Sequence, residues 1–159
     1  MKRVILFLAF IFPISIFIFL RYFGKNEFTI PVYYEEGVDS FPDGCTVNST
    51  TPYQVSDGTL NSLGWNGSVV LIVSDTTSEA QRNLSKMIDD SGLDKLQLII
   101  HSDADSVFGK FCRCDLLLEK PWTAVLLDEQ RRIRGYYAPN SREELDRLSV
   151  EIKILLNKY

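Results

Sequence analysis

The stretch at residues 68–91 constrains the fold of this chain more than any other. It opens with a run of apolar, mostly β-branched residues at 69–73, which is too short for a helix and typical of a buried strand. Thr76 and Glu79 then have the spacing of a helix capping box. Apolar residues follow on one helical face: Ala80, Leu84, Met87 and Ile88. A strand that turns directly into a helix is the unit of an open α/β sheet, whose carboxyl edge collects ligands.

Strand patterns recur further along the chain. Apolar runs predict strands at residues 96–101 and 122–128, and an alternating pattern predicts a fourth strand at 131–137. A turn at Glu129 and Gln130 makes the fourth strand antiparallel to the third.

Two helices complete the order. A short helix is expected at residues 103–111, capped by Ser102 or Asp103, and residues 111–121 are expected to be irregular. Residues 141–158 carry the clearest helical pattern of the chain. The succession β-α-β-α-β-β-α predicts an α/β domain at residues 68–159, a mixed sheet flanked by helices.

Residues 25–67 read as an N-terminal extension of this domain. Residues 28–34 could form an extended segment, which Pro31 would keep at a sheet edge. Residues 52–55 and 59–60 flank a Ser-Asp-Gly turn, so a short hairpin is expected there.

Residues 1–24 differ sharply from the rest. Lys2 and Arg3 precede an apolar run that no charge interrupts before Arg21. The run has the length of a short membrane span, about 17 to 25 residues, and exceeds the apolar core of a cleaved signal peptide. We therefore predict an uncleaved signal anchor, an N-terminal transmembrane helix. The protein would be a single-pass membrane protein whose domain lies on the exoplasmic, periplasm-like side.

The charge and the metal-binding residues exclude some functions. With 17 basic and 21 acidic residues the net charge is -4, and no basic stripe indicates nucleic acid as a partner. Three cysteines and one histidine are too few for a disulfide framework or a zinc cluster.

The C-terminal half resembles a known family. Residues 124–137, AVLLDEQRRIRGYY, followed by SREELDRL at 141–148, are similar to the closing hairpin and helix of the Sco/SenC family. Members of that family are membrane-tethered thioredoxin-fold proteins associated with copper delivery and cytochrome c oxidase assembly. The resemblance implies a thioredoxin-like mixed sheet and a respiratory oxidase as partner.

The resemblance also implies where the family's copper site would lie. That site consists of a C-x-x-x-C motif at the first strand–helix turn and a histidine before the third strand. Here Ser78 and Arg82 stand at about the two cysteine positions and Lys120 near the histidine position. Serine is a poor copper ligand, and arginine and lysine bring positive charge. The family's copper site and a thioredoxin-type dithiol are therefore expected to be missing, while Pro121 stands where thioredoxin-like proteins carry a cis-proline.

Cys112 and Cys114 are the only close pair of cysteines. They are candidate copper ligands, or a redox pair, with Lys110 and Arg113 favouring their thiolates. A structural pair is the alternative, because residues at i and i+2 diverge in a helix. In an oxidising compartment Cys45 could instead form a disulfide with either of them.

These observations lead to three hypotheses for the function. The first is a non-catalytic assembly or binding factor related to respiratory oxidase biogenesis, with no cofactor. The second is a copper(I) chaperone that uses a relocated site at Cys112 and Cys114. The third is a thiol-disulfide oxidoreductase.

Overall fold

Four strands form one mixed sheet in the computed structural model, which describes residues 11–19, 21, 29–47, 50–93, 95–102 and 105–156. The strands are β1 (Val70–Val73), β2 (Gln97–Ile100), β3 (Ala124–Leu127) and β4 (Ile133–Tyr137). Their order across the sheet is β2-β1-β3-β4. β1 pairs with β2 in parallel and with β3 in antiparallel, and β3 and β4 form an antiparallel hairpin.

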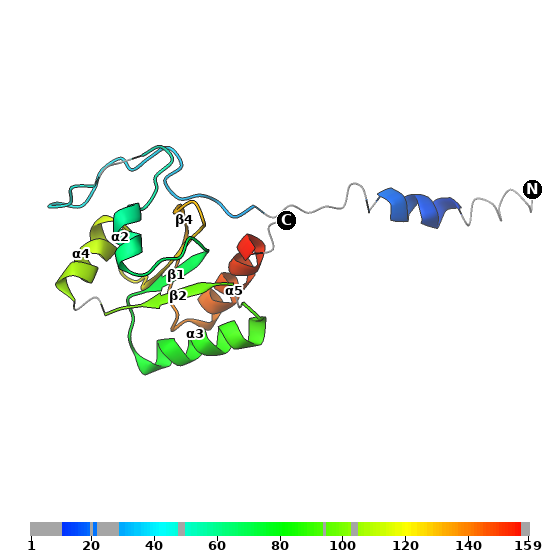
Figure 1. Cartoon of the computed structure of the whole chain (residues 1–159). Coiled ribbons are helices and arrows are strands. Elements are labelled where there is room, and N and C mark those ends of the chain that lie inside the picture. Colours follow the sequence, from blue (N-terminus) through cyan, green and yellow to red (C-terminus); the bar gives the residue numbers. More distant parts are fainter. Residues whose placement is uncertain are drawn as a thin grey trace, which may run out of the picture.

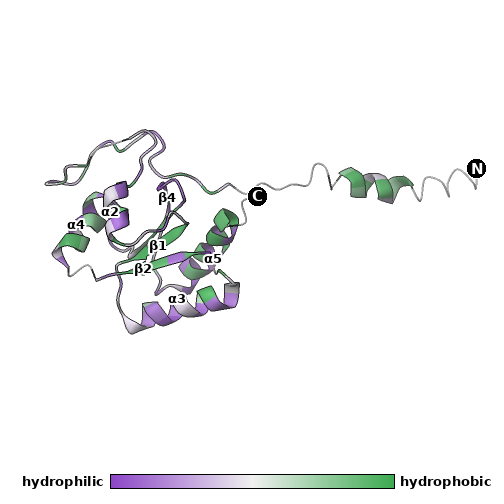
Figure 2. Cartoon of the chain, viewed as in Figure 1, coloured by the Kyte–Doolittle hydropathy of each residue, from purple (hydrophilic) through white to green (hydrophobic). Residues whose placement is uncertain are grey.

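Helices cover both faces of this sheet. They are α2 (Asp57–Ser62), α3 (Ser78–Ser91), α4 (Ser106–Cys114) and α5 (Arg142–Leu156). In Figure 1, α3 and α5 lie on one side of the sheet, and α2, α4 and the chain before α2 lie on the other. α3 mixes hydrophilic and hydrophobic residues along its length, whereas β1 is hydrophobic throughout (Figure 2).

The side chains of β1 explain this layered arrangement. Successive residues of a strand point to opposite faces, so a strand with helices on both sides must be apolar at every position. Val70 and Ile72 belong to the core beneath α2 and α4, whereas Leu71 and Val73 belong to the core beneath α3 and α5. All four are fully buried, which confirms the strand expected at this place.

The caps of α3 and α4 differ from the expected ones by a few residues. The Thr77 hydroxyl, not that of Thr76, caps α3 by accepting a hydrogen bond from the Ala80 amide at 3.3 Å. The Asp105 carboxylate caps α4 by accepting from the amides of residues 107 and 108 at 2.8 and 3.2 Å. Asp103 lies outside the described residues. α4 also continues through Cys114, into the stretch that was expected to be irregular.

The expected hairpin near residue 57 is wrong. Residues 57–62 form α2, because the Leu60 amide bonds to the Ser56 carbonyl at 3.1 Å and the Leu60 side chain is fully buried. The preceding residues pair elsewhere: the Val55 amide donates to the Arg131 carbonyl at 3.0 Å. A short local pattern could not show that the partner of this segment lies far along the chain.

β4 is buried along its whole length, although an alternating pattern of apolar and polar residues is typical of a strand with one exposed face. Tyr137 packs in the core formed with α5. On the other face the rings of Tyr33 and Tyr136 meet edge to face with centroids 5.3 Å apart. The amide of Tyr33 also donates to the Ile133 carbonyl at 2.9 Å. The N-terminal extension therefore closes the face that the strand pattern left open.

The predicted N-terminal transmembrane helix is wrong, and this corrects the expected fold class. The described residues of this segment, 11–19 and 21, are helical. Across the described residues, no helix is both long and apolar enough to cross a membrane. A single-pass anchor, and the exoplasmic location that depended on it, are not supported. The other residues used for that prediction, 1–10, 20 and 22–24, lie outside the described residues.

What the structure shows is a mixed α/β fold with a four-stranded mixed sheet and helices on its faces. The sheet is only loosely thioredoxin-like, and the Lys120–Pro121 peptide bond before β3 is cis.

Candidate functional site

The candidate site lies at the carboxyl edge of the two parallel strands. From β1 the chain passes to α3 on one face of the sheet, and from β2 it passes to α4 on the opposite face (Figure 1). Two neighbouring parallel strands whose connections part to opposite faces leave a crevice beyond their carboxyl ends. The general rule for open α/β sheets therefore places a ligand or partner here.

A pocket of about 220 Å³ occupies this position, and we call it the carboxyl-edge pocket. Its wall comes from the residue after β1, from α4 and from the loop before β3. The lining residues are Ser74, Gly109, Cys112, Arg113, Leu118, Lys120, Trp122 and Thr123.

Backbone hydrogen bonds hold the loop before β3 in place. The amide and the hydroxyl of Ser74 both donate to the Thr123 carbonyl, at 2.8 and 3.1 Å. The Thr123 amide donates to the Tyr137 carbonyl at 3.0 Å, which continues the pairing of β3 and β4. The Trp122 amide donates to the Glu119 carbonyl at 3.0 Å and closes the turn around the cis-proline. The indole of Trp122 is thereby presented at the pocket from a rigid support.

The two candidate copper ligands are not brought together. Cys112 is buried and lines the carboxyl-edge pocket, whereas Cys114 lines a neighbouring pocket of about 340 Å³ with Cys45. Both residues lie on α4, where positions i and i+2 point about 200° apart.

Cys114 forms a disulfide with Cys45. Their Cα atoms are 5.3 Å apart, within the usual range for a disulfide, and the bond joins residues 69 positions apart. This is one of the two pairings that the sequence left open. Cys112 is not part of this bond.

The three residues at the family's site positions are also dispersed. Ser78 and Arg82 are exposed on the first turns of α3, and neither lines the carboxyl-edge pocket. Lys120 is exposed and does line the pocket. In the part of the chain that the structure describes, no group of three or more His, Cys, Asp or Glu side chains is arranged to hold a metal ion.

The charge at the mouth of the pocket is positive. Arg113 and Lys120 are both exposed lining residues. Asp105 carries the opposite charge at the start of α4, and the hydrogen bonds from the backbone of Phe108 and Val107 lower its pKa. The Arg113 guanidinium also donates to the Asp43 carbonyl at 3.2 Å.

Sequence reasoning missed two residues of this site. Ser74 follows the strand predicted at residues 69–73 and was given no role, and Trp122 was taken as the first residue of the strand predicted at 122–128. Trp122 is 36% exposed, which is high for a tryptophan at the end of a buried strand. The available signal was its position directly after a proline that the fold could hold in the cis form.

Comparison with known proteins does not assign a family. No protein-family model matches the chain, and no curated protein matches it. The similarity to the Sco/SenC family therefore stays a prediction from the sequence.

Proposed function

We propose that this protein is a non-catalytic binding factor that contacts a partner protein through the carboxyl edge of its sheet. The observation that carries the proposal is the exposed Trp122, held by a rigid loop beside the cationic side chains of Arg113 and Lys120. Tryptophan and arginine are enriched among residues that dominate the energetics of protein interfaces. The two cations favour a partner with an acidic contact surface.

The state of the cysteines supports binding over redox catalysis. A dithiol oxidoreductase exposes a reactive cysteine pair at the turn after the first strand, where this chain has Ser78 and Arg82. Cys114 is held in a disulfide with Cys45, and Cys112 is buried.

The resemblance to the Sco/SenC family supplies the first partner class to test. It suggests that the partner is a component of a respiratory oxidase or of its assembly machinery. The proposed role is to hold that component during assembly through contact alone.

The test compares two truncations of exposed apolar side chains in the full-length protein. Trp122→Ala removes the proposed anchor, and Val150→Ala removes a side chain that is 57% exposed on α5. Both variants are expected to fold, and Trp122→Ala is expected to weaken binding at least about tenfold, as loss of an interface anchor does. The readout is the amount of oxidase subunits that co-purifies with tagged protein at matched expression.

Charge reversal provides the second arm of the test. Lys120→Glu is expected to lower recovery of the same subunits. The difference in recovery between the wild type and the variant should become smaller at high salt, because salt screens the charges on both. Equal recovery with Trp122→Ala and wild type, or no oxidase subunit with either, would contradict the proposal.

Copper(I) binding is a second candidate, favoured by one observation. Reduction of the Cys45–Cys114 bond would yield two thiols whose Cα atoms lie 5.3 Å apart, with Cys112 nearby in sequence. A Cu(I) titration of the reduced protein against a competing chelator tests it, with Cys112→Ser and Cys114→Ser variants in parallel. Tight one-to-one binding that Cys114→Ser abolishes would replace the binding-factor proposal with a chaperone function.

A further inference from the structure

A second pocket lies at the opposite edge of the sheet, and we call it the amino-edge pocket. It has a volume of about 460 Å³ and is located where β1 begins and β3 ends. Its lining residues are Val69, Asp128, Glu129, Gln130, Arg132, Arg134, Leu155 and Leu156. None of them lines the carboxyl-edge pocket, so this second site is independent of the function proposed above.

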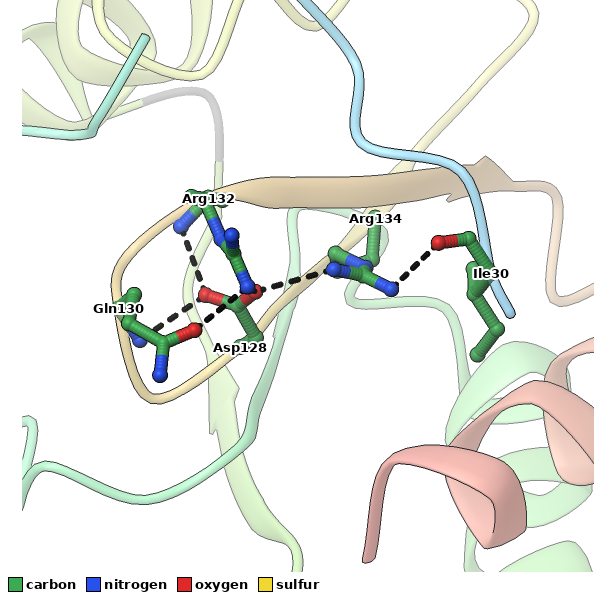
Figure 3. A network of polar contacts seen from close by, with 5 residues as sticks. All are labelled: Ile30, Asp128, Gln130, Arg132 and Arg134. Carbon is green, nitrogen blue, oxygen red and sulfur yellow. Dashed lines mark hydrogen bonds and ion pairs between the residues drawn. The ribbon is translucent and has the colours of Figure 1, made fainter. Parts of the chain in front are cut away.

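Two guanidinium groups share one buried carboxylate in this pocket (Figure 3). Asp128 Oδ2 accepts from Arg132 Nε at 2.8 Å and from Arg134 Nη1 at 3.3 Å. Asp128 Oδ1 accepts from the backbone amides of Gln130 and Arg132 at 2.9 and 3.0 Å. The carboxylate is thus fully engaged by groups of its own hairpin.

Arg134 is the less satisfied of the two arginines. Its side chain is 4% exposed, and its Nη2 donates to the Ile30 carbonyl (Figure 3). Its Nε is the one buried side-chain nitrogen or oxygen in the described part of the chain that has no hydrogen-bond partner. A buried donor without an acceptor destabilises the fold, so an acceptor from outside the hairpin would be stabilising.

Around the buried Asp128 carboxylate, the positive charges outnumber the negative charge. Arg132 and Arg134 contribute two positive charges against the single charge of Asp128. Glu129 also lines the pocket, but it is exposed to solvent, where its charge is screened. Burial lowers the pKa of Arg134, and the nearby Asp128 opposes this effect.

Three apolar residues also contribute to the wall of the pocket. Val69 is buried, and Leu155 and Leu156 at the end of α5 are half-buried beside the arginines. The pocket therefore combines a mainly polar lining with a few apolar side chains, which suits a small molecule that has a polar group and an apolar body.

We propose that the amino-edge pocket binds a small organic anion, with its oxyanion on the guanidinium groups of Arg132 and Arg134 and its apolar body against Leu155 and Leu156. Guanidinium groups present N–H donors in a fork that matches carboxylate and phosphate oxygens. The contacts with Asp128, Gln130 and Ile30 use only some of these donors.

The test is an NMR titration of the ¹⁵N-labelled full-length chain at constant ionic strength. Acetate, hexanoate and inorganic phosphate are the probes, and the arginine Nε–Hε signals are the readout. We expect saturable shifts of the Arg132 and Arg134 signals. Hexanoate should bind more tightly than acetate because only hexanoate reaches the leucines, and a stronger effect of phosphate would identify a phosphate-bearing ligand.

Three variants make the result specific. Arg132→Gln is expected to weaken binding about tenfold, since it removes a charged donor, and Glu129→Gln is expected to strengthen it by removing a like charge. Arg142→Gln, which removes an exposed cation from a different pocket, should leave affinity unchanged. The proposal is overturned if no probe shifts these signals saturably, or if Arg132→Gln and Arg142→Gln bind alike.

Discussion

At the scale of single residues, the ionisable groups near the sheet have sharply different surroundings. Asp128 and Arg134 are almost entirely buried and bond to each other, whereas Glu129, next in the chain, is exposed. Asp115 is partly buried, and Asp105 is exposed at a helix start. Removing a charge should therefore have a different effect at each of these positions.

Asp128→Ala is expected to destabilise the protein by about 3–5 kcal/mol, because it leaves the buried Arg134 guanidinium without a counter-charge. Glu129→Gln, at the exposed neighbouring position, should change the free energy of unfolding by less than about 0.5 kcal/mol. Urea denaturation of both variants measures the difference. Similar losses in the two would show that the buried pair is not the cause.

Asp115→Asn is expected to make the protein more stable than the wild type, by a margin that grows as the pH rises. Burial raises the pKa of Asp115, and Lys110 opposes the shift. The wild-type residue therefore contributes stability below its unfolded pKa, about 3.9, and loses it as the pH rises through the higher folded value. Melting temperatures of variant and wild type should coincide near pH 3 and diverge upward of about pH 4. A constant difference across pH would contradict this explanation.

Asp105→Asn is expected to show the opposite pH dependence. Hydrogen bonds from the amides of Phe108 and Val107 lower the pKa of Asp105, so its charge adds stability above the unfolded pKa, and this is lost as the pH falls. The variant should melt below the wild type at pH 7, and the gap should close in acid. A gap that is unchanged or wider at pH 3 would argue against a role for the charge.

At the scale of elements, the four strands agree with their sequence patterns, and the helix starts show where local patterns mislead. Thr76 and Thr77 stand side by side before α3, and both have side chains that can cap a helix. The capping-box spacing favours Thr76, but the structure assigns the cap to Thr77. Backbone geometry decides between them, because the capping residue must have extended dihedral angles at the helix boundary, and Thr77 has them.

Thr77→Ala should destabilise the protein by about 1 kcal/mol, because the Ala80 amide loses its acceptor. Thr76→Ala is the matched control, since it removes the same atoms one position earlier, and it should have little effect. Thermal or urea unfolding of the pair measures both. A larger loss of stability for Thr76→Ala would show that Thr76 is the capping residue, as the sequence pattern predicts.

At the scale of the whole molecule, the N-terminal extension is bound to the domain by covalent and polar contacts. The Cys45–Cys114 disulfide joins it to α4, and the Arg134 side chain joins it at Ile30. The Arg113 guanidinium also donates to the Asp43 carbonyl at 3.2 Å. Residues 29–47 and 50–55 thus form part of the fold and cover one face of the sheet (Figure 1).

Loss of the disulfide should therefore destabilise the whole domain. Closing a loop between residues 69 positions apart is worth about 4 kcal/mol in the chain-entropy account. We expect Cys45→Ala, or a reducing agent, to lower the urea midpoint strongly. Cys112→Ala, which leaves the bond intact, should have a smaller effect. If reduction leaves the midpoint unchanged, the extension does not depend on this bond.

The sequence by itself determined the elements whose signals are local. Apolar runs located all four strands, the turn at Glu129 and Gln130 made the last two antiparallel, and helical spacing located α3 and α5. Such patterns succeed because strand and helix periodicity follow from the direction in which each residue presents its side chain. The same reasoning failed at the N-terminus, where hydropathy alone predicted a membrane span, whereas no helix among the described residues is long and apolar enough to cross a membrane.

Only the tertiary structure decided which residues meet. It paired Cys45 with Cys114, separated Cys112 from Cys114, and buried Arg134 against Asp128 and Ile30. The Cys45–Cys114 and Ile30–Arg134 contacts join residues far apart in the chain, and their energy depends on burial and geometry that no local window contains. Both candidate sites are of this kind, because each includes side chains from elements that are far apart in the chain.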